Sequence, residues 1–153
     1  MEADRLTAWD RELRAAHARL RAALAATREA LEAGTPAPEA SSDLLLFCVG
    51  FCAALDGHHR SEDRTLFPAV QTEHPELEDV IGRLMQDHAM LSQLLGSLRA
   101  AVEKDADADA VRRHLDGVGA LMESHFRYEE RQLLEPLRAL TLPSAVPDVL
   151  GPL

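Results

Sequence analysis

Two short stretches of the sequence place a histidine four residues before a glutamate. His58 precedes Glu62 in one stretch, and His125 precedes Glu129 in the other. On a helix, this spacing puts the imidazole and the carboxylate one above the other on the same face, so that both can reach one metal ion. The two pairs therefore predict metal-binding chemistry.

The elements that must position these pairs are helices. Alanine, leucine, arginine and glutamate dominate the composition, and all four are strong helix formers. No stretch alternates apolar and polar residues for long enough to indicate a strand. Periodicity and breaker residues instead predict helices at about residues 4–33, 43–71, 76–104 and 107–140. Apart from the loop at residues 35–42, the connections are short, which predicts an all-α, antiparallel up-down-up-down four-helix bundle.

Local signals mark the ends of these helices. A cluster of short oxygen side chains at residues 41–43 is predicted to cap the second helix. An acidic start near Asp107 suits the dipole of the fourth helix. Pro68 is expected to kink or end the last turns of the second helix, and Pro136 is expected to bend the last turns of the fourth.

Apolar residues recur every three or four positions along the first helix, which marks one buried face. That face comprises Leu6, Trp9, Leu13, Ala16, His17, Leu20, Leu24 and Leu31. Elsewhere, the residues predicted as core include Phe47, Phe51, Leu55, Leu66, Leu121, Met122 and Phe126. We expect one bundle domain at residues 1–140, followed by an irregular, proline-rich tail at residues 141–153.

One histidine from each helix is predicted to lie at the same depth in the bundle. In an antiparallel pair of helices, residues equally far from the shared loop lie side by side. Counted from the loops, the matched histidines of successive helices differ in depth by one or two residues, about 1.5–3 Å at the helical rise. These four histidines are His17, His58, His88 and His125.

The other three histidines are not predicted to join this level. His59 points about 100° away from His58, so we expect it to meet a neighbouring helix or solvent rather than a metal ion. His114 lies about 16 Å from His125 along the helix and is expected at the edge of the core. His74 is also followed four residues later by a glutamate, but it precedes a proline and is predicted to lie in a loop.

Four imidazoles and two carboxylates at one level of a bundle would be costly to bury without a partner. A metal cluster would remove this cost. Six donors exceed what one tetrahedral zinc ion takes, and they suit two ions that prefer octahedral coordination and are bridged by the carboxylates. No glutamate is followed three residues later by a histidine, so the Glu-x-x-His pairs of ferritin-like di-iron bundles are absent.

The order His, His-x-x-x-Glu, His, His-x-x-x-Glu on four successive helices resembles the hemerythrin-like (HHE cation-binding) domain family. Residues 58–68, HHRSEDRTLFP, and residues 125–130, HFRYEE, are similar to that family's second- and fourth-helix signatures. The resemblance covers about residues 4–140. It implies a non-haem di-iron centre, bridged by carboxylates and by an oxo or hydroxo group, that binds or reacts with dioxygen, peroxide or nitric oxide. The ligands it implies are His17, His58, Glu62, His88, His125 and Glu129, with Glu62 and Glu129 as the bridges.

Two features depart from the oxygen-carrying hemerythrins. Those carriers have two histidines four residues apart on the third helix, whereas here Leu84 and Ser92 stand at that spacing from His88. The carriers also use a carboxylate five residues after the fourth-helix histidine, and Glu130 holds that place, so it competes with Glu129 for the role. With one imidazole fewer, an iron ion should keep an open position, which favours redox chemistry or sensing over reversible oxygen carriage. Peroxidase- or catalase-like turnover is the enzymatic form of that chemistry.

Composition limits the alternatives. The chain has 153 residues and a net charge of −10, which suits one soluble domain and disfavours nucleic acid or a membrane surface as partners. No secretory signal or membrane-spanning run is expected, and Cys48 and Cys52 read as buried free thiols, so the expected location is the cytoplasm. Two other functions stay open: a non-catalytic iron or oxygen sensor, and a helical interaction module with a vestigial or zinc-occupied site. The oligomeric state stays open as well.

Overall fold

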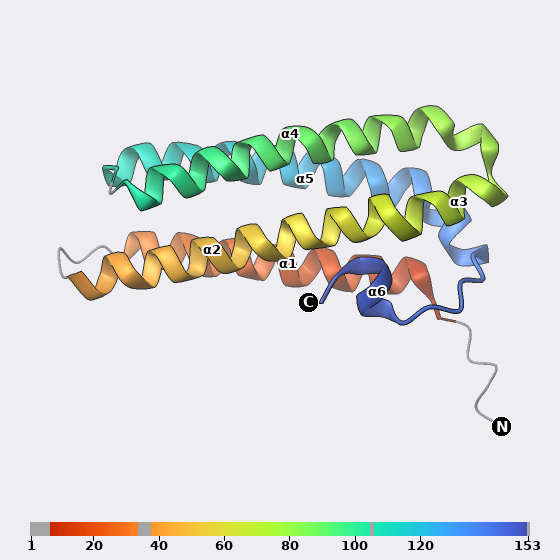
Figure 1. The fold of residues 1–153 in the computed structure, drawn as a ribbon, viewed down its shortest axis with the longest axis horizontal. Coiled ribbons are helices and arrows are strands. Elements are labelled where there is room, and N and C mark those ends of the chain that lie inside the picture. The colour runs from red at the N-terminus through yellow and green to blue at the C-terminus, as the bar shows by residue number, and fades with distance from the viewer. Residues whose placement is uncertain (1–6, 34–37, 105, 153) are drawn as a thin grey trace, which may run out of the picture.

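The computed structural model describes residues 7–33, 38–104 and 106–152, and every regular element within them is helical. Four long rods run antiparallel and side by side (Figure 1). They are α1 (Trp9–Glu32), α2 (Pro38–Ser61) with its continuation, α4 (Glu78–Glu103) and α5 (Ala108–Ala139). α2 continues through the π-helical segment η2 (Glu62–Leu66) into α3 (Phe67–Glu73), and the 3₁₀ turn η3 (Pro75–Leu77) leads into α4. The predicted all-α bundle is confirmed.

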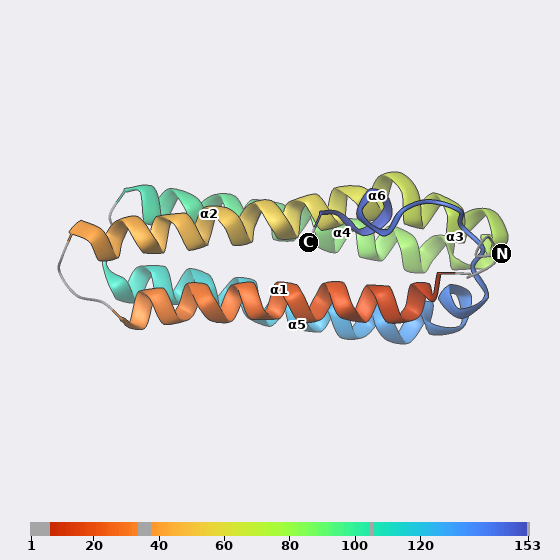
Figure 2. The same ribbon diagram turned by 90° about the horizontal axis from the view of Figure 1, so that it is seen from below.

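Each rod packs against two neighbours. α2 contacts α1 and α4, and α5 contacts the same two helices, so α2 and α5 lie across a diagonal from each other. Figure 2 shows the two layers of this arrangement from below. In the part of the chain that the structure describes, none of the helices combines the length and apolar character needed to cross a membrane.

Two apolar clusters fill the bundle interior, and a polar level separates them. One cluster includes Leu20, Leu55, Leu91 and Met122. The other includes Leu13, Leu66, Leu84 and Leu133. Along each rod, the histidine at the predicted common depth stands between a residue of the first cluster and a residue of the second. Both halves of the core therefore hold the histidine level in place from opposite sides.

Helix boundaries differ from the prediction at two starts and agree at a third. α1 begins at Trp9 rather than near residue 4, and Leu6 of the predicted buried face lies outside the described residues. α2 begins at Pro38, so residues 41–43 lie inside the helix and do not cap it. Proline suits a first helical position because the N–H group it lacks would have no acceptor there. Asp107 caps α5 as expected, and its side chain accepts a hydrogen bond from the Ala110 N–H at 2.8 Å.

Pro68 changes the hydrogen bonding of its helix without ending it. The N–H of Phe67 donates to the carbonyl of Glu62, five residues back, which is the pattern of a π turn. A proline ring has no N–H and crowds the carbonyl four residues before it, so the wider turn accommodates it. The expected disturbance at Pro68 takes the form of η2. α5 likewise continues past Pro136 to its end at Ala139.

Two expectations about packing are wrong. Phe47 is 45% exposed, although the other predicted core residues are buried or partly buried. The run at residues 44–55 is apolar on every face, so no polar residue marks the side that points to solvent. The tail at residues 141–153 is not wholly irregular, because it contains α6 (Val146–Leu150), whose last two residues are buried.

A matched pair of substitutions on α2 tests which of its apolar side chains hold the core. Leu55→Ala should lower the free energy of unfolding by about 2–5 kcal/mol, because it leaves a cavity beside the histidine level. Leu46→Ala on the same helix should change it by less than about 0.5 kcal/mol, because Leu46 is 70% exposed. Urea unfolding followed by circular dichroism measures both. Equal losses would contradict the orientation of α2.

Candidate metal centre

All six residues implied as ligands face the middle of the bundle, and a seventh joins them. The seven side chains are His17 on α1, His58 and His59 on α2, Glu62 in η2, His88 on α4, and His125 and Glu129 on α5. None of them is more than 5% exposed. The structure thus brings the predicted set together at one level of the bundle, while their role as metal ligands stays a prediction.

The donor atoms fall into two groups. One group contains His59, Glu62, His88 and His125, and the other contains His17, His58 and Glu129. Within each group, one donor atom per residue lies within 4.8 Å of the others. Because metal–nitrogen and metal–oxygen bonds are about 2.0–2.2 Å long, donors on opposite sides of one ion are about 4 Å apart. Each group is therefore compact enough to close around one ion.

The two carboxylates lie between the groups. Glu62 Oε1 is 3.2 Å from His58 Nε2 and 3.5 Å from His88 Nε2. Glu129 Oε1 is 2.9 Å from His17 Nε2, and its Oε2 is 3.9 Å from His125 Nε2. Each carboxylate thus approaches a histidine from both groups, which is the position that a bridging ligand would need.

Several of these inward-facing atoms have no hydrogen-bond partner among the described residues. They are Nε2 of His17, His58 and His59, and both carboxylate oxygens of Glu62 and Glu129. His17 Nε2 is close to a Glu129 oxygen, but the angles are not those of a hydrogen bond. Each such buried atom costs about 1–3 kcal/mol, and more where it is charged. Cations in the two donor groups would bind these atoms, so the residues present fit a metal.

The outer nitrogens of four histidines have partners. The Nδ1 atoms of His17, His88 and His125 lie 2.7, 2.8 and 3.1 Å from carboxylate oxygens of Glu130, Asp63 and Asp87, respectively. His58 Nδ1 lies 2.7 Å from the carbonyl oxygen of Leu150. All four partners only accept, so Nδ1 carries the proton and donates. For His58, Nε2 is then left with a lone pair that points toward the centre. The Nε2 atoms of His88 and His125 lie 3.1 Å from each other.

Burial keeps most of these imidazoles neutral, which is the form that binds a metal. It lowers the pKa of His58 to about 3 and holds the pKa values of His59 and His125 below the ordinary range. Burial also acts to lower the pKa of His17, but the nearby carboxylates of Glu129 and Glu130 outweigh it and leave that pKa raised.

The pKa values of the two buried carboxyl groups are shifted in opposite directions. Burial, together with the nearby charge of Glu129, holds the pKa of Glu62 well above its ordinary value. Burial acts to raise the pKa of Glu129 as well, but the close approach of His17 and Glu62 and the charge of His17 keep it well below the ordinary value. Of the two, Glu62 is therefore the carboxyl group that takes up a proton first as the pH falls.

The expectation that His59 meets a neighbouring helix or solvent is confirmed, but its place beside the other donor atoms was not expected. His59 does meet a neighbouring helix, since its ring stacks on His88 at 3.8 Å between centroids, but it is buried within a donor group. Consecutive helical residues point about 100° apart, and α2 faces its neighbours α1 and α4 in two such directions. His58 therefore serves the group that includes His17, while His59 serves the group on the α4 side. The adjacent pair of histidines was the signal for this in the sequence.

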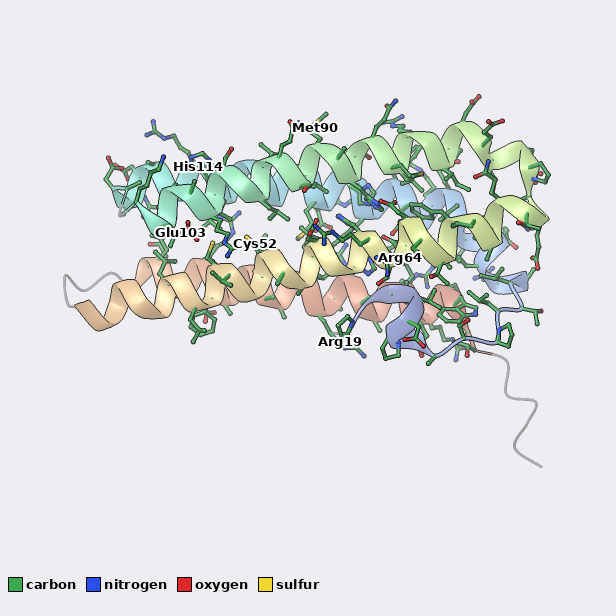
Figure 3. The ribbon with its side chains drawn as sticks, viewed as in Figure 1. Arg19, Cys52, Arg64, Met90, Glu103 and His114 are labelled. Atoms are coloured by element: carbon green, nitrogen blue, oxygen red, sulfur yellow. The ribbon has the colours of Figure 1, made fainter. Side chains whose placement is uncertain are left out.

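The remaining candidates lie outside the centre. Glu129, and not Glu130, is in a donor group, because Glu130 is partly exposed and faces the outer nitrogen of His17. His74 ends α3 and contacts Glu76 instead. His114 lies toward the far end of the bundle, near the loop between α4 and α5 (Figure 3). The placements of His74 and His114 agree with the predictions from the sequence.

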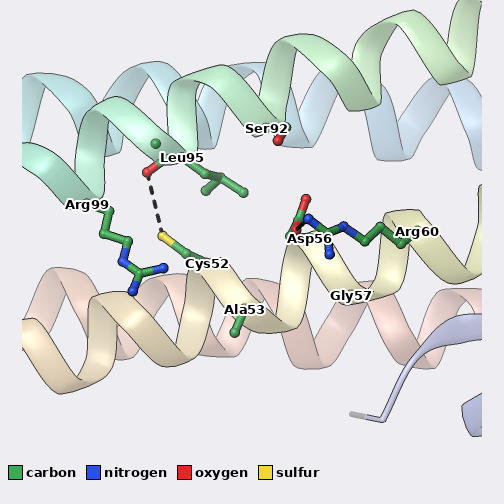
Figure 4. A pocket seen from close by; sticks show the side chains of 9 residues that line it. Cys52, Ala53, Asp56, Gly57, Arg60, Ser92, Leu95 and Arg99 are labelled. Carbon is green, nitrogen blue, oxygen red and sulfur yellow. Dashed lines mark hydrogen bonds and ion pairs between the residues drawn. The ribbon is translucent and has the colours of Figure 1, made fainter.

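A surface groove between α2 and α4 is separate from this centre. It has a volume of about 380 Å³ and includes Cys52, Asp56, Arg60 and Arg99 in its walls (Figure 4). Cys52 Sγ lies 3.9 Å from the carbonyl oxygen of Leu95. None of the seven donor residues lines the groove.

The family is decided by comparison with known proteins. The family model described as the hemerythrin HHE cation binding domain matches residues 10–137, which run from the first turn of α1 almost to the end of α5. This chain belongs to that family. It has no significant match among the curated proteins or among the solved structures. The hemerythrin HHE domain is a cation-binding domain, and the buried histidines and glutamates of this member fit a metal site.

Replacing His59 tests whether the seventh side chain of the hemerythrin domain binds metal. His59→Ala should weaken binding of divalent metal at least about tenfold, because its donor group loses one nitrogen. His114→Ala, which removes an imidazole far from the centre, is the matched control and should leave the affinity unchanged. Competition with a chromogenic chelator measures both. An unchanged affinity in His59→Ala would remove this residue from the ligand set.

The metal-free protein should lose stability as the pH falls below about 6.5. There the unfolded chain protonates His58, His59 and His125, whose native pKa values are lowered. The raised native pKa values of Glu62 and His17 act in the opposite direction and offset part of this. The unfolded state thus binds more protons, by fewer than three, and the free energy of unfolding should fall by roughly 1–3 kcal/mol per pH unit toward pH 5. Urea titrations after chelation test this, and a flat profile would contradict it.

Proposed function

We propose that this protein holds two non-haem iron ions and uses them in redox reactions with dioxygen, peroxide or nitric oxide rather than in reversible oxygen carriage. The observation that supports this most is the pair of buried carboxylates, Glu62 and Glu129. Each lies within 3.9 Å of a histidine from both donor groups. Two groups joined by two carboxylates suit two ions held side by side.

The donor set supports iron. Five imidazoles and two carboxylates are more than one tetrahedral zinc ion can use, and structural zinc sites are usually closed by four ligands. A mixture of imidazole and carboxylate suits iron or manganese in octahedral coordination. The resemblance of the chain to hemerythrins favours iron between these two.

The two groups are unequal, and this supports a reactive ion rather than two structural ones. The larger group supplies three imidazoles, whereas the smaller supplies two, from His17 and His58. An ion in the smaller group would have fewer protein ligands and hence room for a small molecule. Phe126 stacks on the ring of His17 at 3.8 Å between centroids, and this apolar wall would exclude bulk water and large substrates.

The outer hydrogen bonds support redox chemistry over oxygen carriage. Asp63, Asp87 and Glu130 accept from three of the five imidazoles, which makes those imidazoles more basic ligands. Basic, anion-backed ligands stabilise the more highly charged state of a metal, so they favour its net oxidation. This argument replaces the one from a missing imidazole, because His59 supplies a fifth. Bound iron would provide the electrons, while the chain orients the ligands and keeps the centre dry.

Protein isolated without added metal provides the test. It should contain about two irons per chain and absorb in the near-ultraviolet and visible, as ferric pairs do. After anaerobic reduction, exposure to oxygen or peroxide should return the oxidised spectrum without a stable, reversible oxygenated form. Zinc or no metal would contradict the di-iron proposal, and a stable oxygenated form would contradict its redox part.

A pair of variants ties this result to the buried centre. Glu62→Gln should reduce the iron content to one ion or fewer per chain, because one of the two carboxylates shared between the groups is lost. Glu78→Gln, at the exposed start of α4, should keep full iron content. Peroxide consumption well above that of free iron in the parent protein, and its loss in Glu62→Gln alone, would distinguish an enzyme from an iron sensor.

A further inference from the structure

The segment after α5 turns back along the bundle and packs beside the candidate metal centre. Its helix α6 lies against α2, η2 and α1, and Figures 1 and 2 both show it alongside these rods. Val149 and Leu150 are buried in the same apolar cluster as Trp9 and Leu66. This segment is therefore part of the bundle core and not a loose extension.

A main-chain atom of this segment contacts one of the seven donors. The carbonyl oxygen of Leu150 accepts a hydrogen bond from His58 Nδ1 at 2.7 Å. The outer nitrogens of His17, His88 and His125 face side-chain carboxylates instead. A carboxylate can reach its histidine by rotating a side chain, whereas a carbonyl is placed only by the path of its backbone. The contact at His58 thus depends on where residues 146–151 run.

Gly151 makes this path possible. Its φ is +91°, a backbone conformation that side-chain-bearing residues rarely adopt. A Cβ atom at this position would lie 3.1 Å from both Cα and N of His58 and 3.3 Å from the carbonyl carbon of Gly57. All three are main-chain atoms of a helix, so they cannot give way easily. The absence of a side chain lets the segment approach α2 closely enough for the neighbouring carbonyl to reach the imidazole.

We propose that residues 146–151 form a positioning segment for the metal centre, in which the Leu150 carbonyl fixes the tautomer and the orientation of His58. With the proton held on Nδ1, the lone pair of His58 Nε2 faces the smaller donor group. The segment thereby acts on the ion with fewer protein ligands, the one open to a small molecule. This inference rests on the proposed di-metal function, but the tautomer itself is a property of the metal-free chain.

Loss of the Leu150 carbonyl would allow His58 to adopt the other tautomer, which blocks metal binding. Glu62 Oε1 lies 3.2 Å from His58 Nε2, and a carboxyl oxygen can accept an N–H even when the group is protonated. Without the Leu150 carbonyl, the imidazole proton would move to Nε2 and donate to Glu62. The nitrogen that should bind metal would then carry a proton, and both residues would be withdrawn from the centre.

Nitrogen NMR of the metal-free protein tests the tautomer directly. Long-range ¹⁵N–¹H correlations of ¹⁵N-histidine should show His58 protonated at Nδ1 in the parent chain and at Nε2 in Gly151→Ala. Gly117→Ala is the matched control, because a Cβ there meets open space on α5, and it should keep the parent tautomer. If Gly151→Ala leaves the path of the backbone unchanged, a chain ending at Ala145 serves as the second variant. Circular dichroism checks that each variant remains helical.

Metal affinity gives an independent readout. Chelator competition should show two binding steps in the parent, and in Gly151→Ala one of them should weaken about 10- to 100-fold while the other is retained. Val149→Ala is a packing control, because it trims a buried side chain of α6 but leaves the residue-150 carbonyl in the chain. It should keep both the tautomer and the two affinities.

Each outcome bears on a different statement. An Nδ1 proton on His58 in both Gly151→Ala and the shortened chain would overturn the positioning role, and so would equal weakening by Val149→Ala. Equal weakening of both binding steps would also overturn it. If the parent chain binds no metal but its tautomer shifts in Gly151→Ala, the positioning of His58 stands and the di-iron proposal fails.

Discussion

A layer of seven buried polar side chains crosses an otherwise apolar bundle, and the rest of the structure depends on how its cost is met. Removing a carboxylate or an imidazolium from water costs several kcal/mol for each ion, whereas a whole domain is stable by only about 5–15 kcal/mol. Two devices reduce this cost here. Burial keeps His58 neutral, and the charge of Glu129 is matched by His17. Cations bound between the two donor groups would remove most of what is left.

The depth of this layer was open to prediction because helices convert sequence distance into height. At 1.5 Å per residue, a histidine in each rod of an antiparallel bundle has a calculable level, and His17, His58, His88 and His125 meet there. Direction was harder to predict. Whether His59 turns to solvent or to a second donor group depends on how α2 is rotated against the helices that flank it, and the adjacent histidines alone do not specify that rotation. The Glu129–Glu130 choice was likewise decided by the rotation of α5 against α1.

The features that could not be predicted from the sequence are those where local signals conflict or are missing. Residues 44–55 are apolar on all sides, so periodicity could not show that Phe47 faces outward. The three prolines of the tail indicate irregular backbone, yet proline also suits the first turn of a helix, and Pro147 holds that place in α6. The contact between Leu150 and His58 joins residues 92 positions apart through a main-chain atom. No pattern of side chains in the sequence predicts this contact.

The outer shell explains why the centre is asymmetric in charge as well as in ligand number. Counting Glu62 and Glu129 with Asp63, Asp87 and Glu130, five carboxyl groups lie on or directly behind the imidazoles. Fully ionised, their five charges would exceed those of two divalent ions by one, so oxidation of one ion would bring the site to neutrality. Asp63 and Asp87 stand behind two imidazoles of the larger donor group. The smaller group has one outer carboxylate, Glu130 behind His17, and a neutral carbonyl behind His58. An ion in the smaller group would therefore be stabilised less in its oxidised state than its neighbour. If the centre holds the two irons proposed, they would differ in potential and in openness, an arrangement suited to electron transfer between metals and a small oxidant.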